Sequence, residues 1–75
     1  MFMENSKNYI LSISQKIKQY RREQYLSQKQ LGEILGLSAQ AISKWENETA
    51  YPDLFVLPKL AELLGCQVDD FFRVP

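Results

Sequence analysis

The sequence contains no histidine and a single cysteine, Cys66. These two counts exclude a disulfide framework, a zinc finger, a cysteine–histidine nucleophile pair and a serine–histidine triad. A lone thiol is typical of a reducing compartment, so we expect a cytoplasmic protein, and no cofactor is indicated. No phosphate-cradling glycine loop and no carboxylate pair at a credible spacing is present, which argues against an enzyme.

Long apolar runs are also missing. The longest uninterrupted one, Leu54 to Leu57, is far below the about 20 residues that a membrane span requires, so no membrane partner is expected. The N-terminus lacks the basic region and apolar stretch of a secretory signal. The 75 residues, of which 45% are hydrophobic and 24% charged, have the composition of one small globular domain.

The net charge is zero, but it is distributed unevenly. Residues 1–31 hold six basic and two acidic residues, a net charge of +4, whereas residues 32–75 hold three basic and seven acidic residues, a net charge of −4. This asymmetry suggests a charged face that is presented to a partner, although a dipolar solvated surface explains it equally well.

Apolar residues recur at three- and four-residue steps, and β-branched alternation is absent, which predicts an all-α protein. The first helix is expected from Ser12 to Gln24, with Ser12 and Gln15 as a capping box. The apolar stripe continues backwards through Tyr9 and Ile10, which leaves a start near Ser6 open. Residues 1–11 are then an N-terminal extension, helical in part if the earlier start holds.

Two short helices follow in close succession. Ser27 and Gln30 form a stronger capping box, which opens a helix that Gly36 ends. Ser38 is the next N-cap, and it begins a third helix from Ala39 to Asn47. Two short helices joined by a glycine-containing turn of three or four residues make a helix-turn-helix.

The C-terminal third predicts two more helices. One lies between Asp53 and Leu64, with Gly65 at its end, and Pro58 predicts a kink or a fresh start near Leu57. The other runs from Val68 to about Phe72. The four leucines expected to face inward in the fourth helix are Leu57, Leu60, Leu63 and Leu64. Residues 12–73 thus form a compact five-helix bundle that contains the helix-turn-helix.

The third helix separates into two faces on a helical wheel. Small or hydrogen-bonding side chains occupy one arc, and mostly apolar ones occupy the other. The polar arc holds Ala39, Gln40, Ser43, Lys44 and Asn47, and the inward arc holds Ala41, Ile42, Trp45 and Glu46. Gln40 can pair with adenine, and Lys44 can donate to guanine in a DNA major groove. Any surface helix exposes such residues, so the wheel alone leaves both interpretations open.

Glu46 is the charged member of the inward arc. A buried carboxylate is costly unless it is paired, and the first helix offers Arg21 or Arg22. Arg21 lies four residues after Ile17 and borders the same apolar stripe, whereas Arg22 is turned about 100° away. We therefore expect an ion pair between Arg21 and Glu46, the alternative being a partly exposed Glu46 without a partner.

The chain from Ile13 to Phe71 resembles the Cro/repressor-type helix-turn-helix family, also called the XRE family. The segments that carry the resemblance are LSQKQLGEILGLSAQAISKWEN and LPKLAELLGCQVDDFF. The resemblance implies a lambda repressor-like fold of five helices and a sequence-specific transcriptional regulator, expected to be a repressor, that binds double-stranded DNA as a homodimer with its third helix in the major groove. By position it implies base contacts from Ala39, Gln40, Ser43 and Lys44, and backbone contacts from Gln28, Lys29, Ser38 and Asn47. The pair of Arg21 and Glu46 is also like the family's buried ion pair.

Two residues depart from the family's pattern. Tyr25 stands where the family usually has a glycine after the first helix, and Glu48 replaces the common glycine after Asn47. If both keep a positive φ they store strain, and otherwise the turns differ. Glu48 also brings negative charge close to the expected DNA backbone, where it either weakens binding or imposes discrimination.

Dimer contacts are expected from the apolar residues that the core needs least. These are Phe55, Phe72 and Val74. An equal alternative is that Phe55 and Phe72 cover a small core. A second function class stays open, in which the same fold serves as a protein-interaction or antitoxin module with an unidentified protein partner.

Overall fold

The computed structural model describes the backbone of residues 2–72 and the side chains of residues 13–72. Four α-helices and one 3₁₀ helix follow one another, with no strand among the residues described. They are α1 (Phe2–Gln24), α2 (Gln28–Leu35), α3 (Ala39–Glu46), α4 (Leu57–Leu64) and η1 (Val68–Phe72). The all-α prediction is confirmed, but the fifth element is not an α-helix. None of the helices in this part of the chain is long and apolar enough to cross a membrane.

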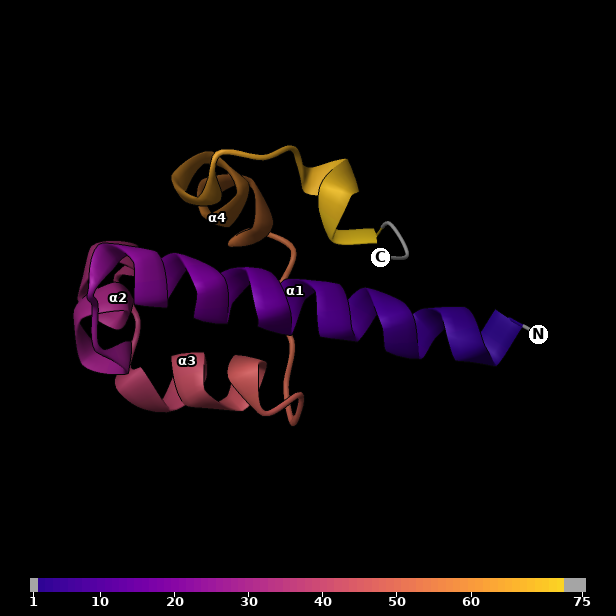
Figure 1. The fold of residues 1–75 in the computed structure, drawn as a ribbon, viewed down its shortest axis with the longest axis horizontal. Coiled ribbons are helices and arrows are strands. Elements are labelled where there is room, and N and C mark those ends of the chain that lie inside the picture. The colour runs from indigo at the N-terminus through magenta and orange to yellow at the C-terminus, as the bar shows by residue number, and fades with distance from the viewer. Residues whose placement is uncertain (1, 73–75) are drawn as a thin grey trace.

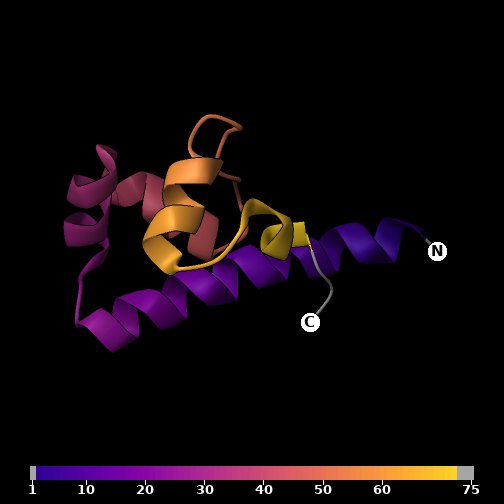
Figure 2. The ribbon, with the colours of Figure 1, turned by 90° about the horizontal axis from the view of Figure 1, so that it is seen from above.

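Helix α1 runs along the length of the molecule, and the other elements lie against it (Figure 1). α3 lies on one side of it, and α4 and η1 lie on the other, while α2 closes the end where α1 finishes. A view from above shows α1 running past the other helices toward the N-terminus (Figure 2). Buried apolar residues fill the space between these elements: Ile17, Leu31, Leu35, Ile42, Trp45, Leu57, Leu60, Ala61 and Phe71.

The predicted start of α1 at Ser12 is wrong, because the helix begins at Phe2. Even the alternative start near Ser6 is too late. No proline or glycine occurs between Phe2 and Gln24, so nothing interrupts helix propagation through the capping-box residues. The predicted end at Gln24 is correct.

The helix-turn-helix forms as the cap residues predict. Ser27 and Gln30 make both hydrogen bonds of the capping box, and the Ser38 hydroxyl accepts the backbone N–H of Ala41. α2 buries Leu31 and Leu35, whereas Ile34 remains exposed. Gly32 packs so closely that a Cβ there would lie 2.6 Å from the carbonyl oxygen of Leu37. This glycine therefore allows α2 to approach the turn before α3.

The predicted fresh start of the fourth helix at Leu57 is confirmed. The Asp53 carboxylate accepts the backbone N–H groups of Phe55 and Val56 at 3.1 and 3.3 Å, which holds a separate turn ahead of the helix. Pro58 then lies in the first turn of α4, where its missing N–H costs nothing. Leu57 and Leu60 are buried, and Leu63 and Leu64 are partly buried against the core.

The segment predicted as a fifth α-helix is the 3₁₀ helix η1. Its five residues are too few to gain much from α-helical bonding, and short 3₁₀ helices are common as closing elements. The Asp70 N–H donates to the Gln67 carbonyl at 2.9 Å, and the Asp70 carboxylate accepts the Gln67 N–H at 2.9 Å. With η1 held by these two bonds, the side chain of Phe71 is completely buried.

All four α-helices end in the same hydrogen-bonded turn, in which one residue adopts a positive φ. Two of these residues are glycines, Gly36 and Gly65. The other two are Tyr25 with φ 56° and Glu48 with φ 64°. The backbone therefore keeps the glycine-like conformation at both departures from the family pattern, and strain is stored there.

Candidate nucleic-acid interface

Helix α3 has a side of polar and small residues that faces outward and a mostly apolar side that faces inward. Gln40, Lys44 and Asn47 are exposed, and Ala39 and Ser43 are half-buried. We call these five residues the outer face of α3. On the other side Ile42 is fully buried, and Trp45 and Glu46 are nearly so. The separation therefore follows the wheel, and it leaves the longest polar side chains accessible to a partner.

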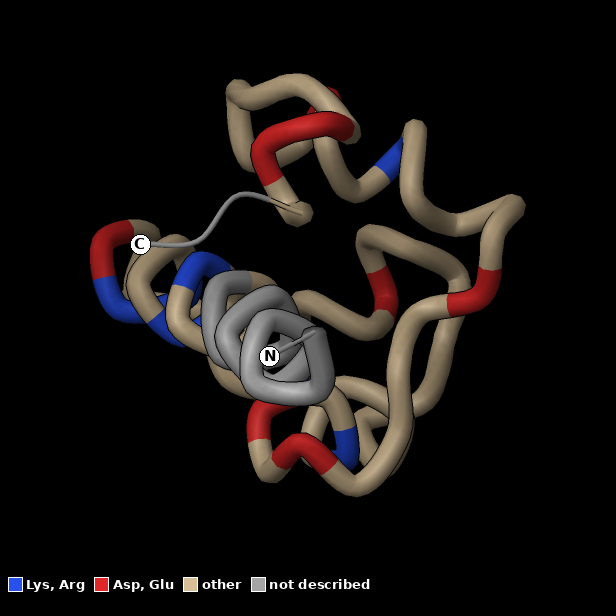
Figure 3. The backbone as a smooth tube through the Cα atoms, turned by 90° about the vertical axis from the view of Figure 1, so that its right-hand side faces the viewer, with Lys and Arg blue, Asp and Glu red and all other residues tan. Residues whose placement is uncertain are grey.

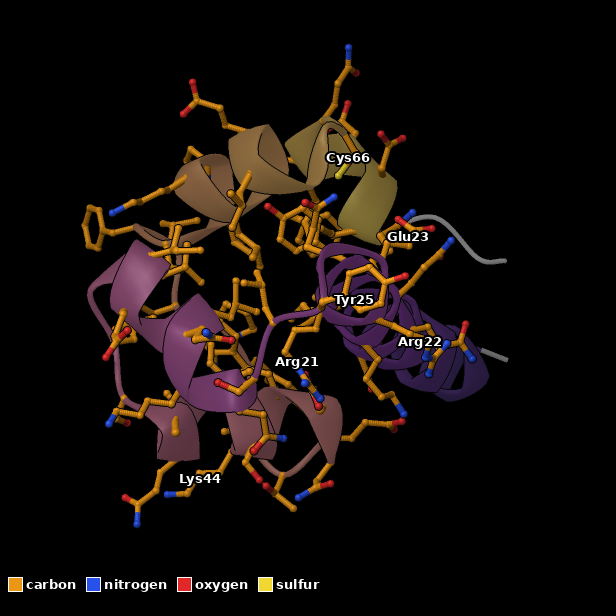
Figure 4. All side chains as sticks on the ribbon, turned by 60° about the vertical axis from the view of Figure 1, so that its left-hand side comes forward. Arg21, Arg22, Glu23, Tyr25, Lys44 and Cys66 are labelled. Carbon is orange, nitrogen blue, oxygen red and sulfur yellow. The ribbon has the colours of Figure 1, made fainter. Side chains whose placement is uncertain are left out.

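The structure brings Arg21 and Glu46 together across the contact between α1 and α3. Arg21 Nε donates to Glu46 Oε2 at 2.6 Å, and the second bond, from Nη2 to Oε1, measures 2.9 Å. The remaining terminal nitrogen donates to the Leu26 carbonyl at 2.9 Å. One guanidinium thus links α1, α3 and the turn that leads into α2. Figure 4 shows Arg21 pointing inward between α1 and α3, and Lys44 pointing away from the body of the protein.

The environment of Glu46 keeps it ionised. Burial alone would raise the pKa of its carboxyl, but hydrogen bonds from Arg21 and Gln28 and the positive charges of Arg21 and Lys18 outweigh burial and lower the pKa overall. The hydrogen bond to Glu46 also raises the pKa of Arg21, against the opposing effect of burial. The pair is therefore charged throughout the neutral range, and it anchors the inner side of α3.

A second tie between α1 and α3 is absent from the sequence-based predictions. The buried hydroxyl of Ser14 donates to the backbone carbonyl of Glu46 at 2.8 Å. This bond satisfies one of the carbonyls that the end of α3 leaves open. A small polar residue between Ile13 and Ile17 on an otherwise apolar stripe is the signal that could have identified it.

Gln28, a predicted backbone contact, is already engaged within the protein. Its Nε2 donates to Glu46 Oε1 at 3.1 Å. An amide carries two N–H donors and one carbonyl acceptor, so one donor and the acceptor are left for an external partner. The bond fixes where that amide stands at the start of α2.

The other predicted backbone contacts occupy the ends of α2 and α3. Lys29 is exposed in the first turn of α2, and Ser38 is the exposed N-cap of α3. Asn47 lies at the far end of α3, where its Nδ2 is 3.4 Å from Ser43 Oγ. As an acceptor in that contact, Ser43 keeps its own hydroxyl proton to donate.

Charge is distributed by element in the folded protein. The described part of α1 carries Lys16, Lys18, Arg21 and Arg22, against Glu23 alone, and most of the acidic residues lie on the other elements (Figure 3). The basic excess of the N-terminal half therefore follows α1.

The residues predicted for a dimer contact are only partly described. Phe55 is 90% exposed and Phe72 is 49% exposed, while Val74 lies outside the described residues. Tyr51 and Leu54 are exposed next to Phe55. The segment between α3 and α4 thus presents apolar side chains that the core does not use.

No metal-binding group was found in the described part of the chain, where no three acidic or cysteine side chains lie close enough together. Cys66 is half-buried, and burial raises the pKa of its thiol. The thiol is therefore protonated at neutral pH and is a poor nucleophile.

Comparison with known proteins places this geometry in a family. The helix-turn-helix family matches residues 17–71. The HTH-type transcriptional regulator PuuR of Escherichia coli (strain K12) is 32% identical over 65 residues, which are 87% of this chain and 35% of PuuR. The HTH-type transcriptional activator BcrR of Enterococcus faecalis is 33% identical over 60 residues, 80% of this chain and 29% of BcrR.

A prophage-derived regulator of Bacillus subtilis (strain 168), the uncharacterized HTH-type transcriptional regulator YonR, is 34% identical over 55 residues, 73% of this chain and 51% of YonR. The chain thus spans between 29% and 51% of the length of these relatives. No solved structure is significantly similar to it. The match over residues 17–71 and the capped pair of helices α2 and α3 agree, and the chain belongs to the helix-turn-helix family of DNA-binding transcriptional regulators.

Proposed function

We propose that this protein binds duplex DNA sequence-specifically as a two-fold dimer, with α3 in the major groove, and that it represses transcription. The observation that carries the proposal is the exposure of Gln40 and Lys44 on a helix whose opposite side is anchored by Ile42, Trp45 and the Arg21–Glu46 pair. A rigidly held helix with accessible amide and ammonium groups is suited to read base edges.

Affinity and specificity come from different residues in this proposal. Gln40 and Lys44 test base edges, with Ala39 and Ser43 close to bases or sugars. Gln28, Lys29, Ser38 and Asn47 contact phosphates and fix the register, because they stand at the ends of α2 and α3. The internal hydrogen bond from Gln28 to Glu46 supports this role, since it holds the amide in one place before DNA arrives.

A dimer is proposed because a single module of this size makes few base contacts. Two copies on a palindrome would place their α3 helices about 34–36 Å apart, one turn of DNA. The exposed Phe55 is the proposed centre of the contact between copies, and Phe72 and Val74 are proposed to contribute to it.

Repression is proposed because it requires no activity beyond DNA binding. A bound dimer blocks a promoter by occupancy alone, whereas activation requires a further contact with the transcription machinery. One relative carries the name of an activator, so a reporter placed behind the selected operator is the direct test. A fall in expression when the protein is present supports repression, and a rise contradicts it.

The experiment that tests DNA recognition is selection from a randomised duplex pool at two salt concentrations, followed by sequencing of the retained DNA. We expect a symmetric enriched motif with half-sites one helical turn apart. Salt-sensitive binding without a motif would reduce the proposal to nonspecific adhesion. No binding at low salt would favour the second candidate, a protein-interaction or antitoxin module, which the exposed Leu54 and Phe55 also suit.

A further inference from the structure

Glu48 occupies a backbone position that favours glycine. Its φ of 64° is close to the φ of 75° at Gly36 and 73° at Gly65, which end α2 and α4 in the same way. L side chains rarely adopt this conformation. A glycine would therefore make the turn after α3 with less strain, and the glutamate side chain does not stabilise the backbone there.

The Glu48 carboxylate also stabilises nothing else in the described part of the protein. Of the three acidic residues in 46–53, Glu46 is paired with Arg21, and Asp53 accepts two backbone N–H groups of the following turn. Glu48 makes no hydrogen bond or ion pair with any described residue through its side chain. Its charge is thus not neutralised by any described residue.

The turn holds Glu48 beside the end of the outer face of α3. The backbone N–H and the hydroxyl of Thr49 both donate to the Lys44 carbonyl, at 2.9 and 3.3 Å, so the chain folds back on the last turn of the helix. Lys44 is the only basic residue between positions 39 and 58. An unpartnered negative charge therefore stands at one end of the face proposed to enter the groove.

We propose that Glu48 limits the affinity of the protein for the phosphate backbone and thereby restrains nonspecific DNA binding. The inference rests on the proposed function. Nonspecific binding is driven by positive charge that displaces counterions, so a carboxylate near the phosphates opposes it on every duplex. The base contacts of the outer face then decide which sites are occupied.

The test compares two substitutions that remove one carboxylate each. Glu48→Gln removes the charge beside α3 and keeps the backbone conformation. Glu62→Gln is the matched control, because Glu62 is exposed on α4, on the opposite side of α1 from α3 (Figure 1). Dissociation constants are measured by fluorescence anisotropy on a random duplex and on the enriched operator. Thermal unfolding and circular dichroism verify that both variants are folded.

We expect Glu48→Gln to tighten binding to both duplexes about three- to tenfold at about 0.05 M salt and less than about twofold at about 0.5 M, where screening is short-ranged. Glu62→Gln should change binding less than about twofold at either concentration. A third variant, Glu48→Gly, separates charge from strain: it should bind as Glu48→Gln does and unfold at a higher temperature.

Equal effects of Glu48→Gln and Glu62→Gln would overturn the inference, because the effect would then follow net charge and not position. Unchanged or weaker binding by Glu48→Gln would also overturn it. In either case wild-type binding would leave the proposed function intact. If the wild-type protein bound no duplex at low salt, the proposed function itself would fail, and the inference would fail with it.

Discussion

The two sides of α3 differ in what holds them. On the inner side Ile42 and Trp45 pack into the core and Glu46 is bonded to Arg21, Gln28 and, through its carbonyl, Ser14. On the outer side Gln40 and Lys44 are exposed and make no side-chain hydrogen bond with any described residue. One eight-residue helix therefore carries two separable tasks, because the side that its residues face changes after every two residues.

This separation has a measurable consequence. Substitutions on the inner side should change the free energy of unfolding, and substitutions on the outer side should change DNA binding with little effect on unfolding. A substitution on either side that changed both unfolding and DNA binding would show that the two tasks overlap at that residue.

The largest effect is expected from Ile42→Ala. Ile42 is fully buried, so removing three carbons leaves a cavity and should lower the free energy of unfolding by about 3–4 kcal/mol. Trp45 stays in place and reports urea unfolding by its fluorescence. Ser43→Ala is the control one residue along, and it should cost less than about 0.5 kcal/mol. A loss for Ile42→Ala as small as that of the control would show that α3 is not anchored by the core.

A smaller loss is expected from Arg21→Met. The substitution leaves the Glu46 carboxylate, whose side chain is 5% exposed, with Gln28 as its remaining side-chain donor. Because Arg21 itself is 23% exposed, we expect a loss of about 2–3 kcal/mol, below the full penalty for breaking a deeply buried pair. Chemical denaturation at neutral pH measures it. A loss below about 0.5 kcal/mol, as at a surface site, would contradict a structural role for the pair.

The same pair predicts a pH dependence with a definite sign. Since the pKa of Glu46 is lowered in the folded protein, its stabilisation is fully present above the unfolded-state pKa of about 4.3 and is lost as the pH falls through the folded-state value. Without Arg21, burial should instead raise that pKa. The stability difference between wild type and Arg21→Met should therefore begin to shrink as the pH falls through the raised pKa of the variant, above about 4.3, and continue to shrink down to the lowered pKa of the wild type, and a constant difference would argue against ion pairing.

On the outer side, Gln40→Ala should weaken binding to the enriched operator by about 1–3 kcal/mol and leave binding to random duplex nearly unchanged. The reason is that an amide can pair with one base edge but contributes little to phosphate binding. Lys29→Ala is the contrasting variant. We expect it to weaken binding to both duplexes and to reduce the salt dependence of binding by about one released counterion. Equal losses on operator and random DNA for Gln40→Ala would remove it from the base-contacting set.

The sequence predicted best where a local signal and the tertiary environment agree. The capping box of Ser27 and Gln30 and the glycine Gly36 set the limits of α2, the N-cap Ser38 sets the start of α3, and the apolar period selected Ile42 and Trp45 for burial. Pro58 located the start of α4, because a proline is compatible with the first turn of a helix and not with its middle. Each of these features depends on a few neighbouring residues.

Predictions failed where the signal was incomplete. Ser12 and Gln15 have the spacing of a capping box, but no breaker precedes them, and the helix continues back to Phe2. The length of η1 gave no means to separate a 3₁₀ from an α-helix. The Ser14 and Gln28 bonds to Glu46 join residues 32 and 18 positions apart, so they depend on how α1 and α2 pack against α3, which no local pattern specifies.

The smallest effect is expected from Tyr25→Gly, a substitution at an exposed residue. The tyrosine side chain is 92% exposed, which by itself suggests a residue without influence on folding. Its backbone, however, is held at φ 56° in the turn that ends α1. Glycine relieves a left-handed strain of about 1–2 kcal/mol, and the greater freedom of glycine in the unfolded chain offsets about 0.4–1 kcal/mol of that gain.

The net result should be stabilisation by about 0.5–1 kcal/mol, seen as a rise of a few degrees in the unfolding temperature, with operator binding unchanged. Tyr25→Ala is the control, since alanine removes the ring but keeps the strained Cβ, and it should not stabilise the fold. If Tyr25→Ala stabilised as much as Tyr25→Gly, the exposed ring and not the backbone would be responsible. Side-chain exposure alone would then predict which substitutions change stability. A response confined to glycine would show that backbone conformation must be considered as well.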